Sequence, residues 1–119
     1  MRIFPPTFSS ESNENSLCIL FERENCAILI TGDRSELGEQ LLLRKAKLPE
    51  VDVLIAGHHG AEDATSEELL RKVKPETVII SVGKDNIYNH PSAATLERLN
   101  HFGCNVLRTD QMGTITYRR

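Results

Sequence analysis

Two adjacent histidines, His58 and His59, are the side chains of this sequence best suited to chemistry. They stand between Gly57 and Gly60, directly after the apolar residues 51–56. Histidine is the commonest metal ligand in proteins and changes its charge near neutral pH. The flanking glycines allow a sharp turn that could bring an imidazole close to an ion. Because neighbouring side chains of an extended backbone point to opposite sides, we expect one imidazole to face a metal. The other would orient it or pack in the core.

An aspartate follows a second apolar run. Residues 27–30 are apolar and lead into Thr31, Gly32 and Asp33. The carboxylate of Asp33 could bind or bridge metal ions at the end of a strand. It could also cap the following helix, because aspartate is a preferred N-cap that accepts backbone N–H bonds. Taken alone, this motif favours the helix cap.

A polar loop provides the third candidate group. Asn86, Tyr88 and His90 offer an amide, a phenol and an imidazole just before a predicted helix. A helix N-terminus favours anions, so a phosphate or carboxylate could be held there, with His90 as donor or general acid. Alternatively, His90 or Ser92 simply caps the helix. We interpret His101, late in that helix, as a solvated cation favoured by the helix dipole.

Strands and helices alternate in the middle of the chain. The hydrophobic pattern predicts strands at residues 17–21, 26–31, 51–56, 77–82, 105–108 and 114–117, and helices at 36–48, 66–73 and 92–102. A four-residue turn at 22–25 and a turn at 110–113 predict hairpins at both ends. This order indicates an α/β fold, a mixed β-sheet with packed helices. Because the three candidate groups each follow a predicted strand, neighbouring strands would bring them to one edge of the sheet.

Local signals place the helix ends and faces. Asp33 or Ser35 can cap the first helix. Asp33 with Glu36, and Thr65 with Glu68, have the spacing of a capping box. The buried face of the first helix is expected to carry the leucines at the proper spacing: Leu37, Leu41, Leu42 and Leu48.

Composition limits the class of protein. The chain has 119 residues, of which 39% are hydrophobic, as expected for one domain. We expect residues 1–14 to be disordered or irregular and residues 15–119 to form the domain. No segment approaches the roughly 20 apolar residues of a membrane helix. The net charge of −3 disfavours broad nucleic-acid binding but allows binding at one groove.

The cysteines do not indicate a site. Three cysteines without a Cys-x-x-Cys spacing, Cys18, Cys26 and Cys104, are best interpreted as buried free thiols.

The order of the motifs resembles the C-terminal half of the metallo-β-lactamase-fold domain of ComEC-type DNA-internalisation competence proteins, over about residues 15–117. The motifs that carry the resemblance are Asn15-Ser16-Leu17, Thr31-Gly32-Asp33, His58-His59-Gly60, Ser81-Val82-Gly83, Asn86-x-Tyr88-x-His90-Pro91 and Arg108-Thr109-Asp110-x-x-Gly113.

This resemblance implies half of a four-layer αββα sandwich. The complete domain would hold two metal ions, zinc or manganese, and would hydrolyse its substrate with a metal-activated hydroxide. Asp33 would bridge the metals, and His59 would be a late ligand, with His58 as the second choice. The catalytic residues would be His90, Tyr88 and Asn86, with His90 beside the substrate phosphate, and the substrate would be single-stranded DNA. The resemblance also implies a parent protein in the bacterial inner membrane, with this segment extracytoplasmic and making no membrane contact itself.

One motif of that family is absent. Its main ligand motif, His-x-His-x-Asp-His, does not occur, since His58 and His59 are the only histidines before residue 90. A catalytic zinc normally keeps three protein ligands. We therefore expect a fragment of a metal-dependent nuclease or phosphodiesterase that is inactive alone. The alternative is a non-catalytic interaction or structural module. We also expect the N-terminal half of the domain, or a second copy, to cover the exposed sheet face.

Overall fold

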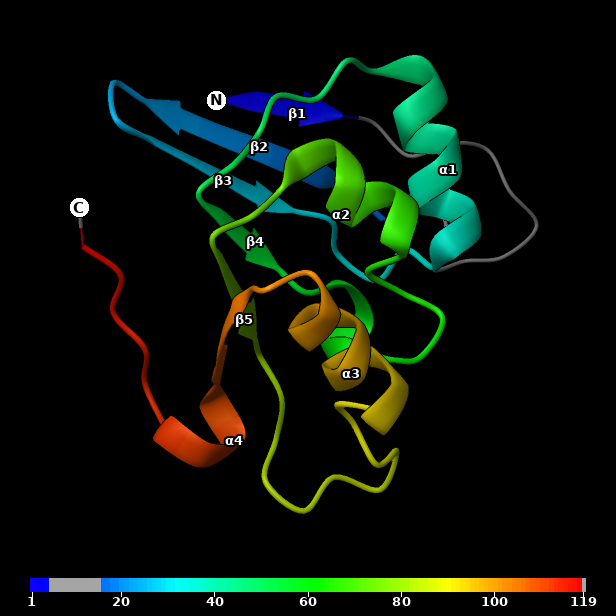
Figure 1. Cartoon of the computed structure of the whole chain (residues 1–119), viewed down its shortest axis with the longest axis vertical. Helices are drawn as coiled ribbons and strands as arrows, with labels where there is room; N and C mark the ends of the chain where they lie inside the picture. The colour runs from blue at the N-terminus through cyan, green and yellow to red at the C-terminus, as the bar shows by residue number, and fades with distance from the viewer. Residues whose placement is uncertain (5–15, 119) are drawn as a thin grey trace.

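A single mixed sheet organises the computed structural model, which describes residues 1–4 and 16–118 (Figure 1). Its strands are β1 (Arg2–Phe4), β2 (Cys18–Arg23), β3 (Cys26–Ile30), β4 (Val53–Ile55), β5 (Thr77–Ile80) and β6 (Asn105–Arg108). The helices in these residues are α1 (Glu36–Lys45), α2 (Glu67–Val73), α3 (Ala93–His101) and α4 (Thr109–Met112), and the short turn η2 (Gly57–Gly60) follows β4.

The strands lie side by side in the order of the chain. β1, β2 and β3 pair antiparallel, whereas β3, β4, β5 and β6 are parallel. The helices α1, α2 and α3 each connect two parallel neighbours. Since such crossovers are right-handed and all three advance in one direction, the helices share one face of the sheet, as Figure 1 shows. The predicted α/β fold with a mixed sheet and packed helices is thus confirmed; the four-layer sandwich stays a prediction.

The helix-covered face of the sheet carries an aliphatic core. Leu20, Leu29, Leu54 and Val78 are aligned across four strands, and each is fully buried. The helices contribute the buried leucines Leu42, Leu69, Leu70 and Leu99. This dry layer fixes the parallel strands, and with them the positions of the loops that follow each strand.

The opposite face of the sheet is apolar but only partly buried. Strand register places on it Ile3, Ile19, Phe21, Ile28, Ile30, Ile55, Ile79 and Leu107. Three of these side chains, Ile3, Phe21 and Ile30, are 53%, 41% and 37% exposed. We call this surface the open sheet face.

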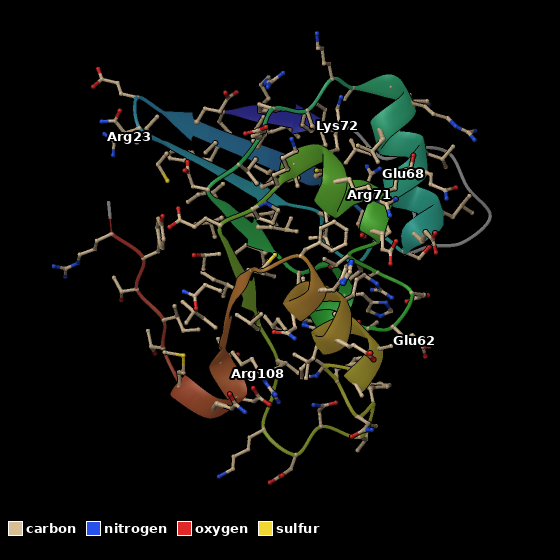
Figure 2. The ribbon with its side chains drawn as sticks, in the orientation of Figure 1. Arg23, Glu62, Glu68, Arg71, Lys72 and Arg108 are labelled. Carbon is tan, nitrogen blue, oxygen red and sulfur yellow. The ribbon has the colours of Figure 1, made fainter. Side chains whose placement is uncertain are left out.

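The outer surface of the helix layer has the opposite character. Figure 2 labels Glu68, Arg71 and Lys72 along α2, and all three are exposed. Arg71 also donates to Glu67 one turn away at 3.0 Å. The helix layer therefore has an ordinary solvated exterior, whereas the open sheet face does not.

Both chain ends differ from the sequence prediction. Residues 2–4, expected to be irregular, form β1 because they pair with the free edge of β2. The remaining part of the 1–14 segment falls mostly outside the described residues. The strand predicted at 114–117 is wrong. Instead, α4 forms at 109–112, because Thr109 Oγ1 accepts from Val82 N at 2.8 Å and draws the chain toward the end of β5.

The buried face of the first helix agrees with the prediction only in part. Leu42 and Leu48 are buried as expected. Leu37 is 51% exposed, and the buried positions are Gly38, Glu39 and Leu42. The cause is Glu39, whose carboxylate points inward to accept backbone N–H bonds from the loop before α2.

The predicted caps are correct in part. Of the two candidates for the cap of α1, Ser35 occupies the N-cap position and Asp33 does not. Ser66 rather than Thr65 caps α2, accepting from Leu69 N at 3.2 Å. Between β2 and β3 the turn contains only residues 24 and 25, because pairing continues to Arg23 and Cys26.

Candidate functional site

The turn η2 holds the histidine pair at the C-terminal end of β4. His58 N donates to Gly32 O at 2.9 Å, which joins this turn to the loop after β3. The backbone here is left-handed rather than extended, with φ of 47° at His58 and 57° at His59. The expectation that the two rings point to opposite sides of an extended chain is therefore wrong, because both residues turn the chain.

His59 is oriented by a backbone carbonyl. Its Nδ1 lies 2.7 Å from Ser81 O, at the end of β5. Its Nε2 lies 4.0 Å from Oδ1 of Asp33, at the end of β3, and both side chains are about half exposed. A histidine that donates Nδ1–H to a carbonyl presents Nε2 as the free ligand nitrogen, the usual arrangement of metal-binding histidines. Asp33 and His59, from two different strand ends, thus come together as the sequence predicted.

Three aromatic rings form a row beside this pair. The ring centroids of His58 and His90 are 5.9 Å apart. Those of His90 and Tyr88 are 5.8 Å apart, with an interplanar angle of 18°. The loop after β5 therefore meets the loop after β4. We call Asp33, His58, His59 and His90 the strand-end cluster.

The surroundings of His90 disfavour its protonated form. Burial lowers the pKa of its imidazole, and the nearby charges of His58 and His59 lower it further. Its Nδ1 is buried without a hydrogen-bond partner in the part of the chain that the structure describes. Such an unpaired buried nitrogen is unusual and marks a place where a ligand or an ordered water would gain a bond.

Asn86 organises the loop that carries His90. Its Nδ2 donates to Gly83 O at 3.1 Å and to His90 O at 2.7 Å, and its Oδ1 accepts from His90 N at 2.9 Å. Both ends of the amide are engaged inside the loop. The structure thus gives Asn86 a positioning role, and its catalytic role stays a prediction.

Gly60 allows the two loops to approach. Its φ is +82°, and a Cβ placed there would lie 2.7 Å from Cβ of Pro91. Gly60 O also accepts from Ser92 N at 3.0 Å, immediately before α3. Only glycine fits at this crossing, so the predicted need for glycine beside the histidines is confirmed at this position.

Three buried or half-buried residues hold the loop between η2 and α2. The carboxylate of Glu39 accepts from Thr65 N at 2.6 Å and from Ser66 N at 2.8 Å. Oγ1 of Thr65 accepts from Gly57 N at 3.0 Å, at the start of the histidine turn. Arg98 donates to the carbonyls of Ala64 and Thr65 at 3.0 and 3.2 Å. We call Glu39, Thr65 and Arg98 the loop brace.

Sequence reasoning missed the loop brace and the Ser81 carbonyl. The signal for Glu39 was a carboxylate in the apolar stripe of the first helix, beside Leu42. No side-chain signal could reveal the bond to Ser81, since its acceptor is backbone.

The last of the predicted motifs forms a local pair. Arg108 donates to both carboxylate oxygens of Asp110, at 3.0 and 2.6 Å. This bidentate bond holds the pKa of Asp110 below its usual range. The pair joins the last residue of β6 to the first turn of α4.

The strand-end cluster fits part of a metal site. Asp33 and His59 offer a carboxylate oxygen and an imidazole nitrogen on neighbouring loops, which suits two positions of a zinc or manganese ion. Among residues 1–4 and 16–118, however, no group of three His, Cys, Asp or Glu side chains is placed to hold one ion. A catalytic zinc usually has three protein ligands. The remaining ligands of a complete site would have to come from elsewhere.

The fold and the cluster define a class: an α/β domain whose imidazoles and carboxylate gather at the C-terminal edge of a parallel sheet. The chain is similar to one segment of three curated proteins. It is 40% identical over 109 residues to ComE operon protein 3 of Bacillus subtilis (strain 168), 37% over 103 residues to Recombination protein 2 of Haemophilus influenzae, and 34% over 109 residues to Competence protein ComA of Neisseria gonorrhoeae.

These matches are to part of each relative. They cover 92%, 87% and 90% of this chain but only 14%, 13% and 16% of the relatives. The chain is therefore homologous to one segment of much longer proteins. No family model matches the chain. In the described part of the chain, every helix is too short or too polar to cross a membrane.

Proposed function

We propose that this chain is part of a metal-dependent phosphodiesterase, a nuclease acting in DNA uptake during competence. The observation that supports this most strongly is the pair of Asp33 and His59, 4.0 Å apart, with the histidine oriented by Ser81 O. The names of the relatives support the biological setting, since they include a competence protein and a recombination protein. The place of a parent protein in a bacterial inner membrane remains a prediction.

The residues of the chain would divide the chemistry as follows. Asp33 and Nε2 of His59 would hold the metal, which would supply a hydroxide and a Lewis acid for attack on phosphorus. His90 would donate a hydrogen bond from its ring to an oxygen of the substrate phosphate. The ring of His58 packs against that of His90. Asn86 would hold the loop after β5 in place, and the loop brace would hold the loop between η2 and α2.

Metal titration tests this proposal. Isothermal titration with Zn²⁺ and Mn²⁺ should show one weak site in the chain, and both Asp33→Ala and His59→Ala should abolish it. The control is His101→Ala, because His101 is an exposed histidine on α3 that stacks edge-on against Phe102, outside the cluster. Equal binding by all four proteins would refute a site at Asp33 and His59.

The second candidate is a non-catalytic interaction module that retains only the fold. The observation that favours it is the incomplete ligand set. Absence of any metal binding, with an unchanged fold by circular dichroism, would support this candidate over the first.

We further propose that another part of the parent protein covers the open sheet face, and that the isolated chain pairs with a second copy there. Ile3, Phe21 and Ile30 are each more than a third exposed on this face. Contiguous apolar surfaces of this kind usually mark interfaces. The chain also covers only about one seventh of its relatives, so most of the parent sequence remains to supply a covering layer.

Light scattering tests this part of the proposal. The chain should self-associate, and Phe21→Lys or Ile30→Lys should shift it to monomer. Leu37→Lys is the matched control, because Leu37 is equally exposed but lies on α1. A monomer at high concentration would contradict the proposal.

A further inference from the structure

The loop after β5 presents two apolar side chains to solvent. Ile87 is 89% exposed, the highest value among the large hydrophobic side chains of the described residues, and its neighbour Tyr88 is 71% exposed. Single exposed hydrophobic residues are common. Here the two are adjacent in the chain, and the ring of Tyr88 stacks on His90 of the strand-end cluster.

The loop holds these side chains in a defined position. The amide of Asn86 bonds to Gly83 O and to both the N–H and the carbonyl of His90, which closes the loop on each side of Ile87 and Tyr88. Asn89 N also donates to Asn86 O at 3.3 Å. Because these bonds already fix the loop, its backbone loses little further conformational entropy when a ligand binds to the exposed side chains.

The Tyr88 ring has one free face. It stacks on the His90 ring at an interplanar angle of 18°, so one face is used within the protein. With 71% of the residue exposed, the opposite face remains accessible to a flat ligand. From Tyr88 the row of rings continues through His90 to His58. A planar group on Tyr88 would therefore lie one ring away from the cluster.

The charge of the chain narrows the type of ligand. The net charge is −3, so a polyanion would gain little from the protein as a whole. The loop itself adds no net positive charge, because Asp85 follows Lys84. The exposed ring therefore points to stacking as the means of recognition. Base–aromatic stacking is the sequence-tolerant contact by which proteins bind single strands, whose bases are free of a partner strand.

We propose that Tyr88, with Ile87 beside it, is a stacking platform for a base of single-stranded DNA, and that it places the neighbouring phosphate at His90 and His58. This inference deepens the proposed function and depends on the same site. Tyr88 is then a substrate-positioning residue rather than a proton donor.

Binding of two oligonucleotides separates stacking from phosphate contact. Fluorescence anisotropy would compare a labelled oligothymidylate with an abasic oligonucleotide of the same length and charge. Tyr88→Ala should weaken oligothymidylate binding about tenfold, within the range for one stacked base, and leave abasic binding unchanged. Tyr88→Phe should bind like the original chain, because the ring remains and only the hydroxyl is lost. Binding should also depend weakly on salt.

The outcomes are distinct from those of the metal test. Equal affinity of the original chain and Tyr88→Ala for oligothymidylate, or no measurable binding by the original chain, would overturn the platform. Loss of binding in Tyr88→Phe would instead assign the effect to the hydroxyl and also overturn it. If the stacking signature is found but no metal binds, the platform stands and the metal-dependent function fails. If metal binds at Asp33 and His59 without base-dependent DNA binding, the reverse holds.

Discussion

The loop brace and the strand-end cluster are neighbouring groups of polar side chains that differ in burial and in hydrogen bonding. In the loop brace, Glu39 and Thr65 are fully buried, and their polar atoms bond to backbone groups. In the strand-end cluster, Asp33 and His59 are half exposed, and a nitrogen of His90 has no partner among the described residues. Buried polar groups are normally satisfied because leaving them unpaired is costly. The satisfied bonds of the brace suit a stabilising role, and the open polar groups of the cluster fit the ligand site that we propose.

The most severe test of this comparison is Glu39→Ala. Two buried backbone N–H groups, at Thr65 and Ser66, would lose their acceptor, so we expect a loss of about 3 kcal/mol in unfolding free energy. Urea denaturation measures it. Glu36→Ala is the matched control, because Glu36 is an exposed carboxylate on the same helix and should cost less than about 1 kcal/mol. Similar losses in both variants would show that the brace is not a special stabilising element.

The brace should also produce a characteristic pH dependence. Burial raises the pKa of Glu39 from 4.5 to about 7. The folded chain then binds this proton more tightly than the unfolded chain. The resulting stability is complete below about pH 4.5 and falls, by up to about 3 kcal/mol, as pH rises to about 7.

Urea denaturation across this range would check the sign. The difference between the original chain and Glu39→Gln isolates the contribution of Glu39, since glutamine does not titrate. A difference that is constant with pH would contradict the raised pKa.

The N-cap of α2 lies next to the loop brace and should contribute less stability than Glu39 does. Ser66 Oγ accepts from Leu69 N at 3.2 Å, so Ser66→Ala should cost about 1 kcal/mol in unfolding free energy. Ser66→Thr keeps an acceptor oxygen and should recover most of that loss in the same denaturation experiment. If threonine recovers nothing, the capping bond is not the cause.

The smallest expected effect concerns the cluster itself. Proton NMR should show His90 titrating below its ordinary pKa of 6.5, because burial and the charges of His58 and His59 disfavour its cation. Replacing His58 with asparagine removes one of these charges and should raise the pKa of His90 slightly. An unchanged or lower value in that variant would mean that the two rings do not interact electrostatically.

The parts of the structure that follow from hydrophobic periodicity were predicted correctly from the sequence. The strand at 77–80, the helix from Ala93 and the meeting of Asp33 with His59 at one sheet edge all follow from apolar runs that end in polar residues. Parallel strand order then brings such ends together without further information.

The failures have a common physical origin in long-range bonds. Glu39 turns inward because the backbone N–H groups of Thr65 and Ser66, 26 and 27 positions further along the chain, need an acceptor. No local sequence pattern contains such a contact. Likewise, Thr65 is diverted from capping by the Gly57 N–H, and Thr109 starts a helix because of Val82. Capping rules rank the residues that can cap, but tertiary partners decide which one does.

The left-handed backbone at His58 and His59 has a consequence for any later redesign of this chain. Non-glycine residues lose about 1 kcal/mol in that conformation, and here two follow each other. Glycine at either position would relieve this backbone strain but would remove an imidazole and, at position 59, the bond to Ser81 O. The chain therefore keeps two strained residues at the place where its imidazoles gather, and a selection for thermal tolerance alone would act against that strain.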